Sequence, residues 1–289
     1  AAESGRLTRS RSGTRARFSE EENRLKILVC VKQVPDVDLV KMDPETGNLI
    51  RAGVPTMLNP LDGNALEAAL RVKEKYGAEV TVITMGPPMA ESTLRDCLAV
   101  GADKAVLISG RPFGGADTLS TSYTIAAAAA MEGSFDLVFA GKESVDGATG
   151  QMGPQLAERM SMAQITNTLL IDEIDENAGT IVAERETDAG VEVIEAKLPC
   201  LLTIEKTNYP ARLPGLKGKL AAKKASVTVY TENNIDGLEP ERIGVPGSGT
   251  IVPEIYPPKL PEPGQMIDEG SDEANSARII DILAGQGVV

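Results

Sequence analysis

The chain of 289 residues contains no histidine and no tryptophan, and only 3% of its residues are aromatic. Without histidine it lacks the usual general base at neutral pH, the commonest metal ligand and the base of a Ser-His or Cys-His pair. No apolar run reaches the roughly 18 residues that a membrane-spanning helix needs. These absences indicate that any chemistry belongs to a bound cofactor rather than to a catalytic side chain or a metal.

Cysteine is scarce as well. Cys30, Cys97 and Cys200 have no C-x-x-C spacing and stand in apolar or helical contexts. Such residues are typical small buried hydrophobes, so we expect neither a disulfide nor a metal site. The pattern suits a reducing compartment, and we favour a bacterial-type cytoplasm over the mitochondrial matrix.

The net charge of −13 argues against general nucleic-acid binding, but the charges are segregated along the chain. Residues 231–289 are strongly acidic. Residues 206–224 contain no acid and hold the cations Lys206, Arg212, Lys217, Lys219, Lys223 and Lys224. This basic segment is either a solvated face or a docking surface.

Residues 1–24 combine arginine, serine and glycine with a run of glutamates, which predicts a disordered tail outside the fold. The segment has no apolar amphipathic face, so it makes a poor transit peptide. We expect translation to start near Leu25.

From residue 25 the pattern alternates between β-branched runs and helical periodicity, which predicts an α/β fold with a doubly wound, mostly parallel sheet. Strands are expected over residues 26–32, 79–84, 104–109 and 136–140, and helices over 62–76, 91–100 and 118–131. In such sheets, ligands bind at the carboxyl ends of the strands.

The second half of the chain departs from this alternation. Three runs separated by turns, residues 168–172, 180–185 and 192–197, predict an antiparallel meander, and residues 200–204 predict a strand that returns to the core. Beyond residue 230 the chain is rich in proline, with one helical stretch over residues 275–283. We expect a core over residues 25–230 and, over residues 231–289, an extended C-terminal arm that wraps a partner.

The most informative segment runs from the strand at 136–140 through Gly141 to Gln151 and into a helix. Glycines in this loop let the backbone approach a ligand closely, and the free N–H groups of the helix point at an anion. The segment matches neither the P-loop nor the dinucleotide fingerprint. By itself it fits a nucleotide site or an ordinary strand-to-helix turn.

Residues 25–289 resemble the beta (small) subunit of electron transfer flavoproteins in several blocks that follow in order. The blocks are Val29-Cys-Val-Lys32-Gln-Val-Pro35-Asp36, Asn59-Pro60-x-Asp62-x-x-Ala65-x-Glu67-Ala, Met85-Gly86-Pro87, Gly141 to Gly153, Ala183 to Glu192, and Leu198 to Thr203. Ala189 departs from the family, in which an acid or glycine is usual, but it lies in a turn outside the nucleotide loops.

Ordinary members of that family hold AMP in this subunit as a structural ligand, whereas electron-bifurcating members hold FAD there and bind NADH beside it. The loop from Phe113 to Thr118, together with residues 85–103, is similar to the bifurcating branch. Its two glycines and the Asp117/Thr118 cap predict a further helix N-terminus able to receive a pyrophosphate.

The resemblance implies an electron carrier that oxidises NADH only within a heterodimer with the alpha subunit. One electron would pass to ferredoxin or flavodoxin, and the other through the FAD of the alpha subunit to an acyl-CoA dehydrogenase. Two alternatives remain: a non-bifurcating beta subunit with structural AMP, and a stand-alone nucleotide-binding or hydrolysing module. The second lacks a P-loop and a candidate nucleophile.

The resemblance also implies the cofactor-binding residues. Those for the adenosine end are Cys30, Lys32, Asn59, Met85 and Gly86. Those in the main phosphate loop are Val145, Asp146, Thr149, Gly150 and Gln151. Those for phosphates or flavin on the NADH side are Gly115, Asp117, Thr118 and Thr121. Within the basic segment, Thr207 to Pro214 looks like the loop that docks the dehydrogenase, and the arm over residues 231–289 looks like the one that embraces the alpha subunit.

Overall fold

The computed structural model of the protein describes residues 24–36, 41–42, 49–50, 55–205, 209–253 and 264–289. The tail expected to be disordered therefore lies outside the described residues, except for Arg24. Contacts divide the chain into two units, of which the first comprises residues 1–41 and 50–252 and the second residues 42–49 and 253–289.

The first unit is built on a sheet with the strand order β11-β10-β9-β12-β8-β1-β6-β7-β13. The parallel strands are β1 (Lys26–Cys30), β6 (Glu79–Met85), β7 (Lys104–Ile108), β8 (Leu137–Gly141), β12 (Cys200–Ile204) and β13 (Thr228–Tyr230). The meander consists of β9 (Ala163–Asp175), β10 (Thr180–Thr187) and β11 (Gly190–Lys197). The predicted doubly wound, mostly parallel sheet with an antiparallel meander is confirmed.

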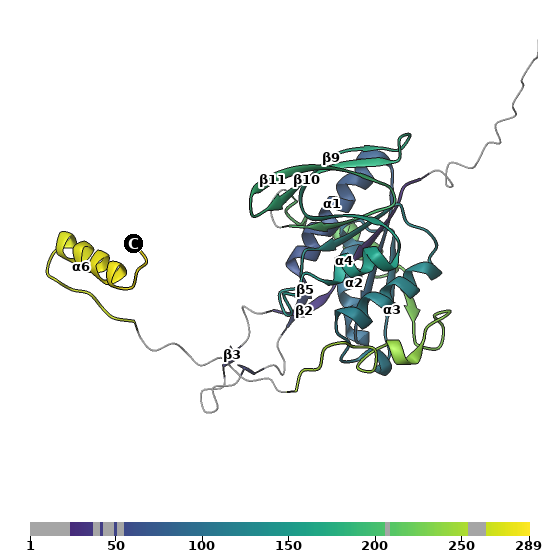
Figure 1. Cartoon of the computed structure of the whole chain (residues 1–289). Coiled ribbons are helices and arrows are strands. Elements are labelled where there is room, and N and C mark those ends of the chain that lie inside the picture. Colours follow the sequence, from purple (N-terminus) through teal and green to yellow (C-terminus); the bar gives the residue numbers. More distant parts are fainter. Residues whose placement is uncertain (1–23, 37–40, 43–48, 51–54, 206–208, 254–263) are drawn as a thin grey trace, which may run out of the picture. The chain divides into compact units, whose positions relative to one another are not determined.

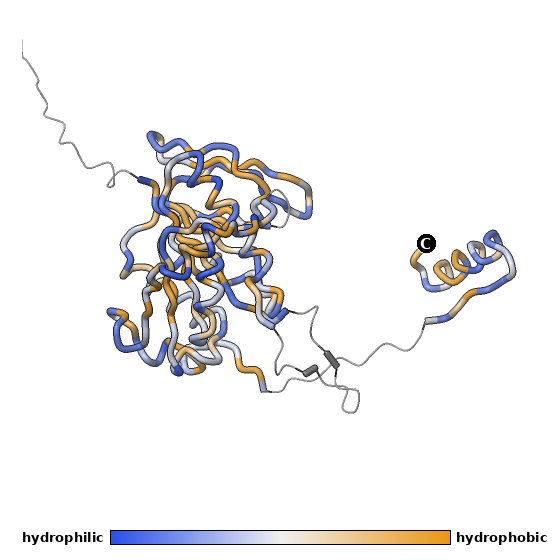
Figure 2. Tube along the Cα trace, turned by 180° about the vertical axis from the view of Figure 1, so that it is seen from behind, coloured by the Kyte–Doolittle hydropathy of each residue, from blue (hydrophilic) through white to orange (hydrophobic). Residues whose placement is uncertain are grey.

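Helices cover both faces of the sheet (Figure 1). One core cluster contains α1 (Pro60–Tyr76) and α2 (Glu91–Val100), and the other contains α3 (Thr118–Met131) and α4 (Met152–Arg159). Successive residues of β1 alternate between them, with Ile27 and Val29 in the first cluster and Leu28 in the second. Because the central strands are buried on both faces, most of their residues are apolar, and Figure 2 shows largely hydrophobic colouring in the interior of the first unit. Buried threonines, such as Thr81 and Thr84 of β6, are the exceptions.

Local sequence sets the bounds of these helices. Helix α1 starts after Asn59 with proline in its first turn, and it ends at Gly77, whose φ of 73° gives the left-handed C-cap. Helix α3 starts at Asp117, whose side chain accepts a hydrogen bond from the N–H of Ser120. The remaining helix of the first unit is α5 (Leu216–Ala222).

Several short elements were not expected from the sequence. Strands β2 (Gln33–Pro35) and β5 (Thr56–Leu58) pair with each other, as do β3 (Lys41–Met42) and β4 (Leu49–Ile50). Three short 3-10 helices are η2 (Pro88–Ala90), η3 (Arg111–Phe113) and η4 (Pro240–Arg242).

In the second unit, α6 (Asp272–Gly285) contains the helix expected over residues 275–283 and begins one turn earlier, at the Ser271 cap. Among the described residues, no helix has the length and apolar character needed to cross a membrane.

Residues 231–252, assigned to the arm by the sequence alone, belong to the first unit. Ile235 and Ile243 are buried in the core cluster of α3 and α4. These two apolar residues are separated by turns and follow no helical or strand period, so local pattern did not predict their burial. That the arm wraps a partner stays a prediction.

Candidate functional site

A cavity of about 960 Å³ opens at the carboxyl ends of β1, β6, β7 and β8. Most of the residues expected at the site line it: Cys30, Lys32, Met85, Gly86, Gly115, Asp117, Thr118, Thr121, Thr149, Gly150 and Gln151. The fold therefore brings the loops after four strands to one cavity, as the carboxyl-end rule for open α/β sheets predicts.

Asn59, Val145 and Asp146 do not line the cavity. Asn59 is fully buried, donates from Nδ2 to the carbonyl oxygen of Glu143 at 2.9 Å, and accepts at Oδ1 from the N–H of Val145 at 3.1 Å. Its amide thus holds the β8–α4 loop by two backbone contacts. We interpret Asn59 as a residue that positions this loop, and not as a direct adenosine contact.

Asp62, in the first turn of α1, joins the ends of two neighbouring strands. Its carboxylate accepts from the N–H of Lys32 at 2.8 Å and from the N–H of Gly141 at 3.1 Å. Burial raises the pKa of Asp62 to about 7, even though the hydrogen bonds from Asn59, Lys32 and Gly141 lower it. A β-carbon on Gly141 would lie 2.5 Å from Oδ1 of Asp62, so this close approach requires glycine.

Two lysines at the cavity are paired. Nζ of Lys32 lies 2.7 Å from the carboxylate of Asp146, and Nζ of Lys142 lies 2.7 Å from that of Glu205. Burial raises the pKa of Asp146, but hydrogen bonds from Lys32 and Ser144 outweigh it, so the pKa lies below its usual value. Arg111 also lines the cavity, and within the described part of the chain it forms no ion pair.

Asp117 lines the cavity, but its two carboxylate oxygens are occupied. One caps α3 by accepting from the N–H of Ser120, and the other accepts from the N–H groups of Gly249 and Thr250 at 2.8 and 2.9 Å. Burial raises the pKa of Asp117, but the backbone hydrogen bonds outweigh it, so the pKa lies below its usual value. We therefore interpret Asp117 as a residue that joins the β7–α3 loop to residues 248–250.

The two glycine-containing loops are in contact. Thr118 donates from Oγ1 to Oε1 of Gln151 at 3.1 Å, which links the N-termini of α3 and α4. Gly115 has a φ of 73°, and a β-carbon there would meet the side chain of Val245 at 2.7 Å. Gly150 is also left-handed, with a φ of 62°. The backbone conformations of both loops thus depend on glycine.

Cys30 lines the cavity as a neutral thiol. Burial, and to a smaller degree the charge of Asp62, raises the pKa of this thiol well above its usual value. All three cysteines are buried and free. A protonated, buried thiol is an apolar wall of the cavity and not a nucleophile.

Some lining residues were not predicted from the sequence: Ser109, Gly110 and Arg111 after β7, and Thr250. Phe113, Lys142 and Ser144 also line the cavity; they lie in loops that the sequence singled out but were not among the predicted cofactor-binding residues. The carboxyl-end rule would have found the three residues after β7, since they directly follow a strand. Thr250 had no such signal, because it reaches the cavity from a distant segment rich in glycine and proline.

Comparison with known proteins gives a consistent result. A family model described as the electron transfer flavoprotein domain matches residues 46–234. The caffeyl-CoA reductase-Etf complex subunit CarD of Acetobacterium woodii is 46% identical over 244 residues, covering 84% of this chain and 92% of the relative. The electron transfer flavoprotein subunit beta of Clostridium acetobutylicum is 43% identical over 251 residues (86% and 95%), and protein FixA of Azorhizobium caulinodans is 39% identical over 265 residues (90% and 94%).

Proposed function

The chain belongs to the electron transfer flavoprotein family, and from this premise we propose that it is the beta subunit of a heterodimeric, electron-bifurcating member that holds FAD and oxidises NADH. The similarity to beta subunits supports an electron-transfer role with an alpha subunit as partner. The observation that carries the choice of FAD over AMP is that the β7–α3 and β8–α4 loops meet at one cavity.

The cavity fits a dinucleotide. Its volume of about 960 Å³ is near the upper end of the roughly 300–1,000 Å³ found for ligand sites. The N–H groups at the start of α4 carry no side-chain cap and can receive one phosphate, which suffices for AMP. The Asp117 carboxylate already caps α3, so a second phosphate would lie against the backbone of the glycine-containing loop before α3. Arg111 adds a positive charge to the same lining, where Lys32 and Lys142 are each paired with a carboxylate.

FAD bound here would supply hydride acceptance from NADH and one-electron transfer to the acceptors. The protein residues bind and orient it. Asn59, Asp62 and Asp117 fix the loops through backbone hydrogen bonds, and apolar residues such as Phe113 and Ile125 exclude water from part of the cavity. Each change of about 60 mV in a one-electron potential alters the equilibrium about tenfold, so small changes in hydrogen bonding to the flavin direct the electrons.

The proposed electron acceptors are ferredoxin or flavodoxin on one branch and, through the alpha-subunit FAD, an acyl-CoA dehydrogenase on the other. Leu213, Leu216 and Leu220 are exposed in and beside the basic segment, which supports docking of the dehydrogenase there. The name of CarD places that relative in a complex with a reductase of a CoA ester, in keeping with such a partner. The C-terminal arm is proposed to hold the alpha subunit.

Cofactor analysis of the purified heterodimer tests the proposal. We expect two FAD per heterodimer, bleached by NADH. One FAD and one AMP, with no response to NADH, would instead indicate a non-bifurcating subunit.

A variant then tests the position of the site. Gly150→Asp places a carboxylate in the main phosphate loop, so we expect loss of the flavin bound by this subunit through charge repulsion. Gly179→Asp is the matched control, because Gly179 has nearly the same φ, 66° against 62°, and lies in the β9–β10 turn with no atom near its β-carbon position. Flavin loss in both variants, or in neither, contradicts the placement.

A further inference from the structure

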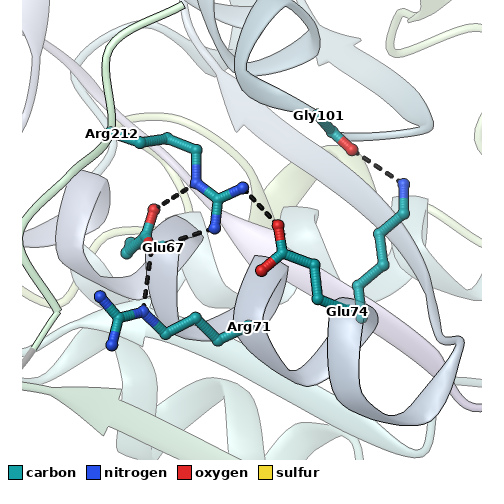
Figure 3. A network of polar contacts seen from close by, with 6 residues as sticks. Glu67, Arg71, Glu74, Gly101 and Arg212 are labelled. Atoms are coloured by element: carbon teal, nitrogen blue, oxygen red, sulfur yellow. Dashed lines mark hydrogen bonds and ion pairs between the residues drawn. The ribbon is translucent and has the colours of Figure 1, made fainter.

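The segment that follows β12 returns along α1, and Arg212 fastens it there. Its Nε lies 2.7 Å from Oε2 of Glu67, and its Nη2 donates to Oε1 of Glu67 at 3.1 Å. Its Nη1 donates to Glu74, about two turns further along the helix. Figure 3 shows the guanidinium group of Arg212 held between the two carboxylates, while Arg71 reaches Glu67 from the other side.

The carboxylate of Glu67 is the buried centre of this network, since only 5% of its side chain is exposed. It accepts three hydrogen bonds from two guanidinium groups. Paired contacts of this fork type are directional as well as strong, so they fix the position of the arginine and not merely its charge.

The next residue in the chain behaves in the opposite way. The side chain of Leu213 is 91% exposed, whereas that of Arg212 points back to α1. Upstream, Tyr209 is buried, and its hydroxyl accepts from the N–H of Ile171 at 2.8 Å. The exposed leucine is therefore presented by a loop fastened on its N-terminal side at two points.

Helix α5, which follows this loop, packs closely against α2. A β-carbon on Gly218 would lie 2.1 Å from the carbonyl oxygen of Ala99, so α5 and α2 are in backbone contact. Arg95 of α2 also donates to the carbonyl oxygen of Ala222 at 2.7 Å. Leu216 and Leu220 stay exposed on the outer side.

From this arrangement we infer that Glu67 is a positioning residue for partner docking: through Arg212 it holds Leu213 in the orientation that enters an apolar pocket, rimmed by acids, on the redox partner. The inference rests on the proposed docking of an acyl-CoA dehydrogenase by this surface. A loop fixed before binding loses less conformational entropy on association, so the anchor improves affinity without touching the partner. Arg212, one of the six cations of the basic segment, acts as an anchor and not as a steering charge.

The test uses the full heterodimer, chemically reduced, and purified butyryl-CoA dehydrogenase as the electron-accepting probe. For Glu67→Gln we expect the KM for the dehydrogenase to rise about tenfold while kcat stays within about twofold, because the loss is one of preorganisation. Arg212→Lys keeps the charge but loses the fork, and we expect a similar rise in KM. Glu79→Gln is the matched control, since Glu79 pairs with Lys104 across strands β6 and β7 and not with Arg212.

Amide hydrogen exchange of residues 211–216 provides a readout that needs no partner. We expect about tenfold faster exchange in Glu67→Gln and no change in Glu79→Gln. Faster exchange with an unchanged KM, or a normal KM in Arg212→Lys, overturns the positioning role. Leu213→Ala separates the proposed docking surface from the positioning role of Glu67. An unchanged KM in Leu213→Ala would show that the docking surface is wrong. A KM raised in Leu213→Ala but not in Glu67→Gln or Arg212→Lys would reject only the role of Glu67.

Discussion

The two buried carboxylates of helix α1 have opposite electrostatic environments. Asp62, at the cavity, accepts from the backbone N–H groups of Lys32 and Gly141 and from the side-chain amide of Asn59, and burial raises its pKa to about 7. Glu67 faces the docking loop; burial raises its pKa too, but hydrogen bonds from Arg212 and Arg71 outweigh it and the pKa falls below normal. Hydrogen bonds from two guanidinium groups thus outweigh the burial of the Glu67 carboxylate, whereas the neutral amide donors around Asp62 do not outweigh its burial.

The largest expected effect is a pH dependence of the free energy of unfolding, which tests the raised pKa of Asp62. Between the pKa of 3.8 in the unfolded chain and about 7 in the folded one, the native state keeps one proton more, so its free energy of unfolding falls as pH rises. At about 1.4 kcal/mol per pH unit this amounts to on the order of 4 kcal/mol. The absence of histidine leaves this pH range nearly free of other titrations, and the carboxylates with lowered pKa act only below about pH 4.5.

Urea unfolding of the full chain at several pH values between 5 and 7 measures this slope. In Asp62→Asn, which cannot ionise, the slope should vanish. An equal slope in both proteins would show that Asp62 is already charged in the native state. Should the variant not fold, carboxyl carbon NMR of the native protein gives the same pKa directly.

The next largest effect tests whether the hydrogen bond between Gly141 and Asp62 requires the close approach of the β8 backbone to helix α1. In Gly141→Ala the new β-carbon would lie 2.5 Å from Oδ1 and 2.8 Å from the backbone nitrogen of Asp62. Because neither the helix nor the strand can yield easily, we expect a loss of about 3 kcal/mol in the free energy of unfolding. Gly215→Ala is the control, since nothing lies near that β-carbon position. A loss in Gly141→Ala as small as in the control would mean that the contact relaxes freely.

The smallest effect tests whether burial of the carboxylate sets the strength of the ion pair at Glu67. Arg212 offers this comparison because it binds one buried and one exposed carboxylate. We expect Glu67→Gln to lower the free energy of unfolding by about 1–2 kcal/mol, less than for a fully buried pair because both arginines reach solvent. For Glu74→Gln, whose side chain is 59% exposed, we expect less than about 0.5 kcal/mol. Equal losses in denaturant titrations of the two variants would show that burial of the carboxylate does not matter.

Much of the fold followed from local pattern. The alternation of apolar runs with helical periods predicted the sheet and its layers. The family resemblance predicted most of the residues that line the cavity, and the rule that ligands bind at strand ends agreed with their place. The three-residue strand β13 was missed because so short a run carries no period.

The roles of particular side chains were harder to predict than their place. Asn59 was predicted at the adenosine end, and in the structure its side-chain amide forms hydrogen bonds with the backbone of residues 143 and 145. From the sequence, Arg212 was only one of six cations in the basic segment. Its ion pairs were not predicted because Glu67 and Glu74 lie far from it in sequence. Such assignments depend on contacts between distant segments, which local periodicity does not encode.

Thr250, bound to Asp117, stands two residues before the first unit ends at Val252. Tension on the polypeptide from the C-terminal side would therefore load the Asp117 carboxylate and the cap of α3 before any strand of the sheet. A pulling force on the residues after Thr250 would therefore act first on the wall of the cavity.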